Sequence, residues 1–357
     1  MDVVFSVDKQ AAFYYWLQIV AGWDDSSAVD AKSLTYYTGQ IHSVLSQEQR
    51  KALHDVKYIL QHNSNPRQLL AELYAGNIRS HDARTIAERA LSCMPLFEAF
   101  VWRDAQKTML RWCDLLQVYD FACTNELLMN IKAFLDSTFD LYATLTVYIL
   151  PNIPGAGVIG HRISGTDFIL LRPYIEYRQS AIANVVTVVL HEYIHAIESC
   201  STRSRALMKQ SYETCIAANH IRPPHGFTWK SMYIEALVYC FANNITGGYA
   251  RTVVSGKLLP RIEEFQRGFH RLRSKGTATT NDVIAWAGLC ITDIAAQYID
   301  EGKVIDVAVV DRISGIYKDM YLTKKRAYDS IRRPSSYSRC SGRAVPLRYN
   351  YSVGVEV

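Results

Sequence analysis

The sequence contains two histidines one helical turn apart, with a glutamate directly after the first: His191, Glu192 and His195. On a helix, side chains four residues apart lie on one face, so both imidazoles can bind one metal ion. The glutamate is placed to take a proton from a water molecule on that ion. This pattern indicates zinc-dependent hydrolysis of a peptide bond, with Zn²⁺ as the cofactor.

The two histidines can meet at one ion only if their segment is a helix. An apolar run over residues 183–190 continues into Ile194 and Ile197, which is typical of a helix buried on most sides. The β-branched residues in this run also fit a strand. In a strand, however, His191 and His195 would lie about 13 Å apart, too far for one ion. We therefore predict a helix, and the alternative is a pair of structural histidines without a metal.

A catalytic zinc site usually takes three protein ligands, so a third must come from elsewhere in the chain. The metzincin pattern is excluded, because Glu198 and Ser201 stand where it requires Gly and His. A site of the gluzincin type would use a glutamate from a following helix. Glu213 and Glu235 both fit that requirement.

His225 is the stronger candidate for the third ligand from the sequence alone. Two prolines end the segment before it, and Gly226 allows a tight turn as an amphipathic helix begins near Trp229. Packing behind such a helix entrance can fix a histidine in position. His220 is a nearby competitor, and the alternative is a solvent-exposed loop histidine.

The motif His-Glu-x-x-His-Ala at 191–196 and the motif His-Gly-x-x-Trp-Lys-x-Met at 225–232 resemble the SprT-like (Spartan-type) zinc metallopeptidases. The resemblance covers about residues 125–245. It implies that His191, His195 and His225 bind zinc and that Glu192 is the general base. It also implies a protein substrate, including proteins associated with DNA.

The segment upstream of the motif extends this resemblance. Residues 157–161 followed by 168–175 resemble the short hairpin of the family, and residues 145–149 fit the strand before it. Two features depart from the family. Twenty-nine residues separate His195 from His225, more than we expect for compact members, and the chain lacks the paired CxxC motifs of a zinc ribbon.

The N-terminal region of the chain is predicted to be helical. Ser46 and Gln49 have the spacing of a capping box before an amphipathic helix. A second helix is predicted from Asn65 to Gly76, and a third from Ser80. With 12 basic and 14 acidic side chains in residues 1–120, a net charge of −2, this region is not an obvious nucleic-acid surface.

The positive charge of the chain lies near its C-terminal end. Residues 324–348 include eight basic side chains and one acidic side chain, and residues 257–275 include six more basic side chains. Tyrosines interleave with the basic residues, a composition that suits a phosphate backbone with stacked bases. The predicted nucleic-acid-binding residues are Lys324, Lys325, Arg326, Arg332, Arg333 and Arg339. The alternative is a solvated tail without a ligand.

Length and composition set the fold expectation. A chain of 357 residues with 49% hydrophobic content can bury a sizeable core. We predict an α+β fold, mostly helical, with a small zincin-type sheet packed on the HExxH helix. The predicted domains are a helical N-terminal region (1–120), a SprT-like core (121–248) and a helical C-terminal region with a basic tail (249–357).

The expected location is intracellular. Eight cysteines without metal or disulfide spacing indicate free thiols in a reducing compartment. The first residues lack the pattern of a signal peptide, and no apolar stretch is expected to reach membrane-spanning length. We expect a cytoplasmic or nuclear protein. The alternative function is a structural or nucleic-acid-associated protein of viral origin, associated with the virion, in which a zincin-like fold holds a non-catalytic metal.

Overall fold

The computed structural model of the protein describes residues 2–23, 31–117, 124–152, 159–162, 168–173, 179–224, 227–242, 262–274 and 278–331. The chain forms two compact units by spatial contact. Unit 1 comprises residues 1–121, 143–185 and 344–357, and unit 2 comprises residues 122–142 and 186–343. These units differ from the three domains predicted from the sequence, with boundaries at residues 120 and 248, and that division stays a prediction.

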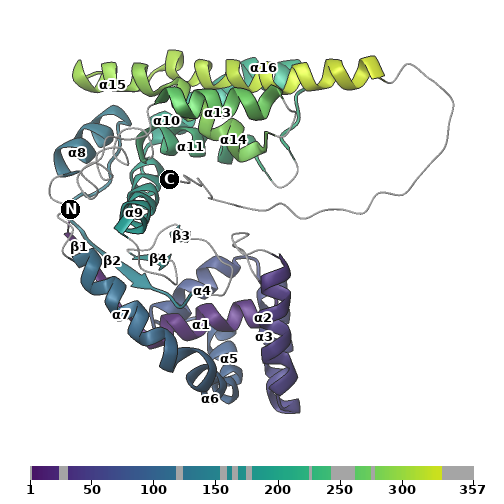
Figure 1. The fold of residues 1–357 in the computed structure, drawn as a ribbon. Coiled ribbons are helices and arrows are strands. Elements are labelled where there is room, and N and C mark those ends of the chain that lie inside the picture. Colours follow the sequence, from purple (N-terminus) through teal and green to yellow (C-terminus); the bar gives the residue numbers. More distant parts are fainter. Residues whose placement is uncertain are drawn as a thin grey trace. The chain divides into compact units, whose positions relative to one another are not determined.

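Unit 1 combines a small sheet with the N-terminal helices (Figure 1). Its strands are β1 (Asp2–Ser6), β2 (Thr144–Ile149), β3 (Ile159–Arg162) and β4 (Phe168–Arg172). Its helices are α1 (Lys9–Val20), α2 (Ala31–Val44), α3 (Gln47–His62), α4 (Pro66–Tyr74), α5 (His81–Ala90), α6 (Met94–Phe97) and α7 (Arg103–Gln117). A 3-10 turn (Leu91–Cys93) and a π-helical turn (Glu98–Trp102) flank α6.

The strand order in the sheet is β1-β2-β4-β3. β1 pairs with β2 and β2 with β4 in parallel, whereas β3 pairs with β4 antiparallel. The predicted strand at 145–149 and the predicted hairpin upstream of the motif are therefore present. Strand β1 is not predicted from the sequence, because its three apolar residues, Val3 to Phe5, are too few to show a period.

The predicted helix starts of the N-terminal region are confirmed. Ser46 and Gln49 form a reciprocal capping box at α3, and the Asn65 side chain caps α4. Gly76 adopts a positive φ of 69° just after α4, and Ser80 caps α5. The core of unit 1 surrounds α1, in which every residue from Ala11 to Val20 is buried.

Unit 2 is helical in the part of the chain that the structure describes (Figure 1). Its helices are α8 (Asn125–Phe134), α10 (Thr202–Ser211), α11 (Trp229–Tyr239), α13 (Ile262–Ser274), α14 (Thr280–Cys290), α15 (Thr292–Asp300) and α16 (Val307–Ile331). A π-helical turn (Tyr212–Ile216) and a 3-10 turn (Ala217–Asn219) follow α10. The predicted motif helix is α9 (Gln179–Ser199), which begins in unit 1 and continues into unit 2.

The fold class is confirmed at the coarse level, because the described part of the chain is mostly helical with a small sheet. The packing of that sheet on the HExxH helix stays a prediction. One expectation needs correction: Thr280–Asp300 is long and apolar enough to cross a membrane by length and composition alone. Buried core helices have the same composition, and Val283, Ile284 and Ala287 of this segment are buried in unit 2.

Candidate metal centre

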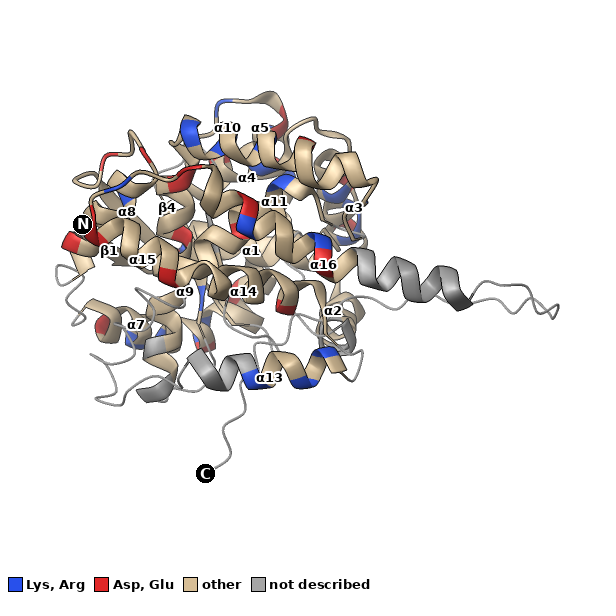
Figure 2. Cartoon of the chain, turned by 90° about the horizontal axis from the view of Figure 1, so that it is seen from above, with Lys and Arg blue, Asp and Glu red and all other residues tan. Residues whose placement is uncertain are grey.

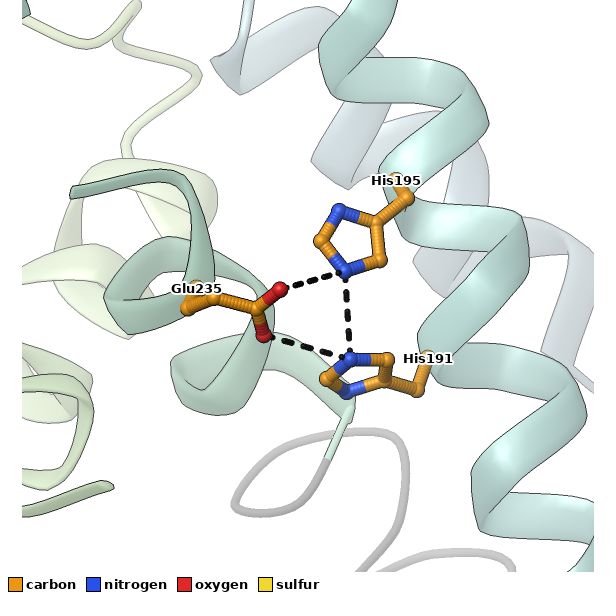
Figure 3. Close-up of side chains that lie close together, drawn as sticks. All are labelled: His191, His195 and Glu235. Atoms are coloured by element: carbon orange, nitrogen blue, oxygen red, sulfur yellow. Dashed lines mark hydrogen bonds and ion pairs between the residues drawn. The ribbon is translucent and has the colours of Figure 1, made fainter. Parts of the chain in front are cut away.

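Three side chains of unit 2 converge on one point: His191 and His195 of α9 and Glu235 of α11 (Figure 3). The Nε2 atoms of the two histidines lie 3.1 Å apart. Glu235 Oε2 lies 3.4 Å from His191 Nε2, and Glu235 Oε1 lies 3.3 Å from His195 Nε2. One ligand atom of each residue lies within 4.8 Å of the other two, and we call these three residues the His-His-Glu cluster.

These separations fit a shared metal ion. Two ligand atoms of a tetrahedral zinc site, each about 2.0–2.1 Å from the ion, lie about 3.3 Å from each other. The three distances in the cluster, from 3.1 to 3.4 Å, lie around that value. Two imidazole nitrogens and a carboxylate oxygen are also common zinc ligands.

Helix α9 presents the histidines on its least buried face. His191, Glu192 and His195 are partly exposed, whereas Leu190 and Ile194 beside them are fully buried. The histidine side chains are 16% and 21% exposed, and that of Glu235 is 33% exposed. The donors are therefore held by packing behind them and are still open to a ligand.

The C-terminal end of α9 is fixed by the loop after α8. Ser137 Oγ donates a hydrogen bond to Ile197 O, and the Thr138 amide donates to Cys200 O. These bonds satisfy carbonyls that a helix end leaves without an intrahelical partner. Tyr193 adds a buried anchor, because its ring packs edge-on against Phe139 at 5.4 Å. The turn of α9 that carries His195 is thereby held in place.

Helix α11 positions Glu235. A capping box of Thr228 and Ser231 starts the helix. Within it, Tyr233 hydrogen-bonds to Ser314 of α16, and Tyr317 of α16 donates to Met232 O at 2.7 Å. The face opposite these buried contacts carries Glu235 toward α9.

Tyr239 is a further aromatic side chain in contact with the cluster. It lies one turn after Glu235 on α11, and its ring packs edge-on against the imidazole of His191 with centroids 5.5 Å apart. Nothing in the sequence alone singles out Tyr239. The spacing of four residues from Glu235 is a signal that could have identified it once Glu235 was chosen as a ligand.

The electrostatics of the cluster couple the histidine to the carboxylate. Burial alone would lower the pKa of His195, but the hydrogen bond and charge of Glu235, with the charges of Glu192 and Glu198, raise it from 6.5 to about 9. Burial alone would raise the pKa of Glu235, but the hydrogen bonds and charges of His191 and His195 lower it well below 4.5. Without a metal, His195 and Glu235 therefore form an ion pair.

The predicted third ligands have different outcomes. His225 lies outside the described residues, so its role stays a prediction. His220 is exposed with a left-handed backbone (φ 53°), and Glu213 is exposed in the π-helical turn. Among the described residues, Glu235 is the candidate that joins His191 and His195.

The other predicted site residues are placed as follows. Glu192 follows His191 on α9, on the partly exposed face. Tyr233 of α11 is buried and hydrogen-bonded to Ser314, and burial raises its pKa to about 12. The backbone of Lys324, Lys325 and Arg326 belongs to α16. Arg332, Arg333 and Arg339 lie outside the described residues.

Comparisons with protein-family models, with curated proteins and with solved structures find no match to this chain. The resemblance to SprT-like metallopeptidases thus rests on its motifs alone and stays a prediction. The geometry of the His-His-Glu cluster is the basis on which a function can be proposed.

Proposed function

We propose that this protein is a zinc-dependent endopeptidase in which His191, His195 and Glu235 bind the metal and Glu192 is the general base. The observation that carries the proposal is the convergence of His191, His195 and Glu235 from two helices (Figure 3). The two Nε2 atoms lie 3.1 Å apart, and each lies 3.3 or 3.4 Å from one oxygen of the carboxylate. Solvent-exposed side chains on helix surfaces rarely converge in this way, because two imidazoles and a carboxylate lose hydration when they are brought together.

The number of ligands favours catalysis over a structural role. Structural zinc sites are usually closed by four protein ligands, whereas catalytic sites use three and keep one position for water or substrate. The described residues offer three, and all three are partly exposed. A site of this kind has room for a reacting group.

Zinc, when bound at such a site, lowers the pKa of a water molecule to about 7 and polarises a carbonyl oxygen. The chain's own contribution is a proton acceptor beside the metal ligands. In the proposed mechanism the Glu192 carboxylate accepts the proton of the attacking water and passes it to the leaving amine nitrogen. The ring of Tyr239 restrains the imidazole of His191 throughout.

The resemblance to SprT-like metallopeptidases offers a variant of this proposal, in which His225 takes the place of Glu235. A site that used both would have four protein ligands and no open position. That outcome would favour the alternative function, a structural or nucleic-acid-associated protein with a non-catalytic metal. The identity of the third ligand therefore bears directly on the function.

Cleavage of unfolded protein by the zinc-loaded chain tests the proposal. We expect wild type to cleave and Glu192→Gln to lose about 10²- to 10⁴-fold in rate, because the general base is absent. Glu192→Gln should still bind one zinc ion, since Glu192 is not a ligand in this arrangement. Zinc-loaded wild type that cleaves no substrate, or Glu192→Gln that cleaves as fast as wild type, would contradict it.

A second observation favours DNA-associated proteins as substrates. Helix α13 exposes Arg267, Arg271 and Arg273, and its last eight residues, 267–274, include no acidic side chain (Figure 2). Phe269 anchors it by stacking on Trp286 of α14, with ring centroids 4.7 Å apart and planes within 8°. Arg267 and Arg271, four residues apart on one face of α13, and Arg273 at its end give a cluster of exposed positive charge that suits the phosphates of a nucleic acid.

Binding of single-stranded DNA at several salt concentrations tests this part. Replacing Arg267, Arg271 and Arg273 by Gln should weaken binding and lower the salt slope by roughly one for each phosphate that is no longer neutralised. Replacing the exposed Arg50, Arg84 and Arg103 of unit 1 by Gln is the control and should change little. Replacing Lys324, Lys325, Arg326, Arg332, Arg333 and Arg339 by Gln separates the tail from α13. Binding that neither basic set alters would exclude both.

A further inference from the structure

Gly288 of α14 lies closer to α11 than any residue with a side chain could. A Cβ atom placed at this glycine would lie 2.6 Å from Ala236 O, 2.9 Å from Tyr239 Cβ and 3.0 Å from Cys240 N. Two of these atoms belong to the backbone of α11 and its C-cap residue, which cannot rotate away. The glycine therefore allows the two helices to approach at this point.

Backbone conformation does not explain a glycine here. Gly288 lies inside a helix, and the described glycines with positive φ are Gly22, Gly76 and Gly302. Gly315, inside α16, offers a contrast, because a Cβ there would meet nothing within 4 Å. Glycine is unfavourable inside a helix relative to alanine. The close contact with α11 is the feature that distinguishes position 288.

The atoms that Gly288 approaches are next to the candidate metal ligand. Ala236 directly follows Glu235, and Tyr239 packs against the imidazole of His191. The other side of α11 is bonded to α16 through Tyr233. The depth at which α11 packs on α14 thus determines where Glu235 and Tyr239 lie relative to the two histidines.

The size of the effect can be judged from distances. Moving Ala236 O from 2.6 Å to an ordinary contact of 3.4 Å requires a shift of 0.8 Å. Metal sites require ligand distances within about 0.2 Å of their preferred values. Residues that orient metal ligands typically change metal affinity by about 10- to 100-fold when they are replaced.

We propose that Gly288 is a positioning residue of the metal site: its lack of a side chain sets the depth of α11, and so brings Glu235 to His191 and His195. This proposal rests on the proposed function, because it takes the His-His-Glu cluster to be the metal site. It assigns to α14, which carries no ligand in that cluster, a part in metal binding.

Zinc affinity of Gly288→Ala tests the proposal, with Gly315→Ala as the matched control. We expect Gly288→Ala to bind zinc at least about tenfold more weakly, and Gly315→Ala to stay within about twofold of wild type. In a Glu235→Gln background the effect of Gly288→Ala should largely disappear, since no carboxylate remains to be positioned. A merely structural glycine would lower metal-free stability and leave this coupling at zero.

The outcomes separate the two proposals. Wild type that binds no zinc overturns the proposed function, and this inference with it. Wild type that binds zinc beside a Gly288→Ala variant of equal affinity overturns the inference alone. If Gly288→Ala does not fold, amide exchange of wild type decides: zinc should slow exchange around residue 288 of α14 as well as in α11. Slowing in α11 without any at α14 would overturn the inference.

Discussion

The buried polar side chains of unit 1 and the His-His-Glu cluster of unit 2 differ in exposure and in spacing. In unit 1 the side chain of Arg172 is fully buried and donates a hydrogen bond to Tyr15 Oη at 2.7 Å, and Tyr74 donates to the buried Gln18 at 2.8 Å. In unit 2 the side chains of the His-His-Glu cluster are 16 to 33% exposed, and the nearest contacts between them are 3.1 to 3.4 Å long. The first set has short bonds within the protein, whereas the second leaves space between its members.

The difference separates polar groups that stabilise a fold from those that hold a ligand. A buried polar group that is hydrogen-bonded to another side chain needs no contact with solvent. Without such a partner its burial would cost free energy. Metal ligands need exposure and matched spacing, since an ion must enter between them. This comparison predicts that changes in unit 1 alter stability and that changes in the cluster alter zinc affinity.

Removal of zinc should have the largest effect. Zinc at a thousandfold excess over its Kd adds about 4 kcal/mol to the free energy of unfolding, because it binds only the folded site. A chelator should therefore lower the melting temperature and speed amide exchange more in α11 than in α1. An equal increase of amide exchange in α11 and α1 would contradict the placement of the metal site in unit 2.

Tyr15→Phe should change stability and leave zinc binding unaffected. The substitution takes the hydroxyl acceptor from the buried guanidinium of Arg172, at a cost of about 1–3 kcal/mol in the free energy of unfolding. Denaturant unfolding measures this cost, and Tyr58→Phe at an exposed position is the control. A tenfold loss of zinc affinity in folded Tyr15→Phe would break the comparison.

Tyr239→Leu should weaken zinc binding by a smaller amount. Edge-on aromatic packing contributes about 0.5–1.5 kcal/mol, so removing the ring beside His191 should reduce affinity by roughly two- to twelvefold. Tyr239→Phe keeps the ring and should bind zinc nearly as well as wild type. A larger loss in Tyr239→Phe than in Tyr239→Leu would assign the effect to the hydroxyl instead.

The pH dependence of the metal-free protein should show the ion pair of the cluster. The pKa of His195 is raised from 6.5 to about 9, so its contribution to stability is full below pH 6.5 and is lost as pH rises through 9. The pKa of Glu235 is lowered from 4.5, so its contribution is present above pH 4.5 and is lost as pH falls further. The difference in unfolding free energy between metal-free wild type and Glu235→Gln should be largest between pH 4.5 and pH 6.5, where both contributions are present. A difference that grows toward pH 9 would contradict the pairing.

Local signals in the sequence are enough to predict many of the elements. The caps at Ser46, Asn65 and Ser80 are predicted correctly because each acts within three residues of itself. The helix α9 is predicted because two histidines four residues apart require one.

Long-range features cannot be predicted in the same way. The pairing of β1 with β2 joins residues 2–6 to residues 144–148, and the single sequence carries no signal for such contacts. The sequence favours His225 over Glu235 as the third ligand, and it does not show that α11 carries Glu235 to the histidines, because a helix that follows α9 can approach it at many angles. In our proposal the contact of Gly288 with α11 sets the depth at which α11 packs, and a glycine in a helix does not by itself indicate such a contact in a sequence.

Zinc affinity of Glu235→Gln beside His225→Ala tests the central claim most directly. Both variants remove one candidate ligand from the same folded chain, and competition with a chromophoric chelator measures the loss. We predict that Glu235→Gln loses more than about 100-fold, beyond the range of residues that only orient ligands, while His225→Ala stays within about twofold. Loss of binding in His225→Ala with none in Glu235→Gln would contradict the claim.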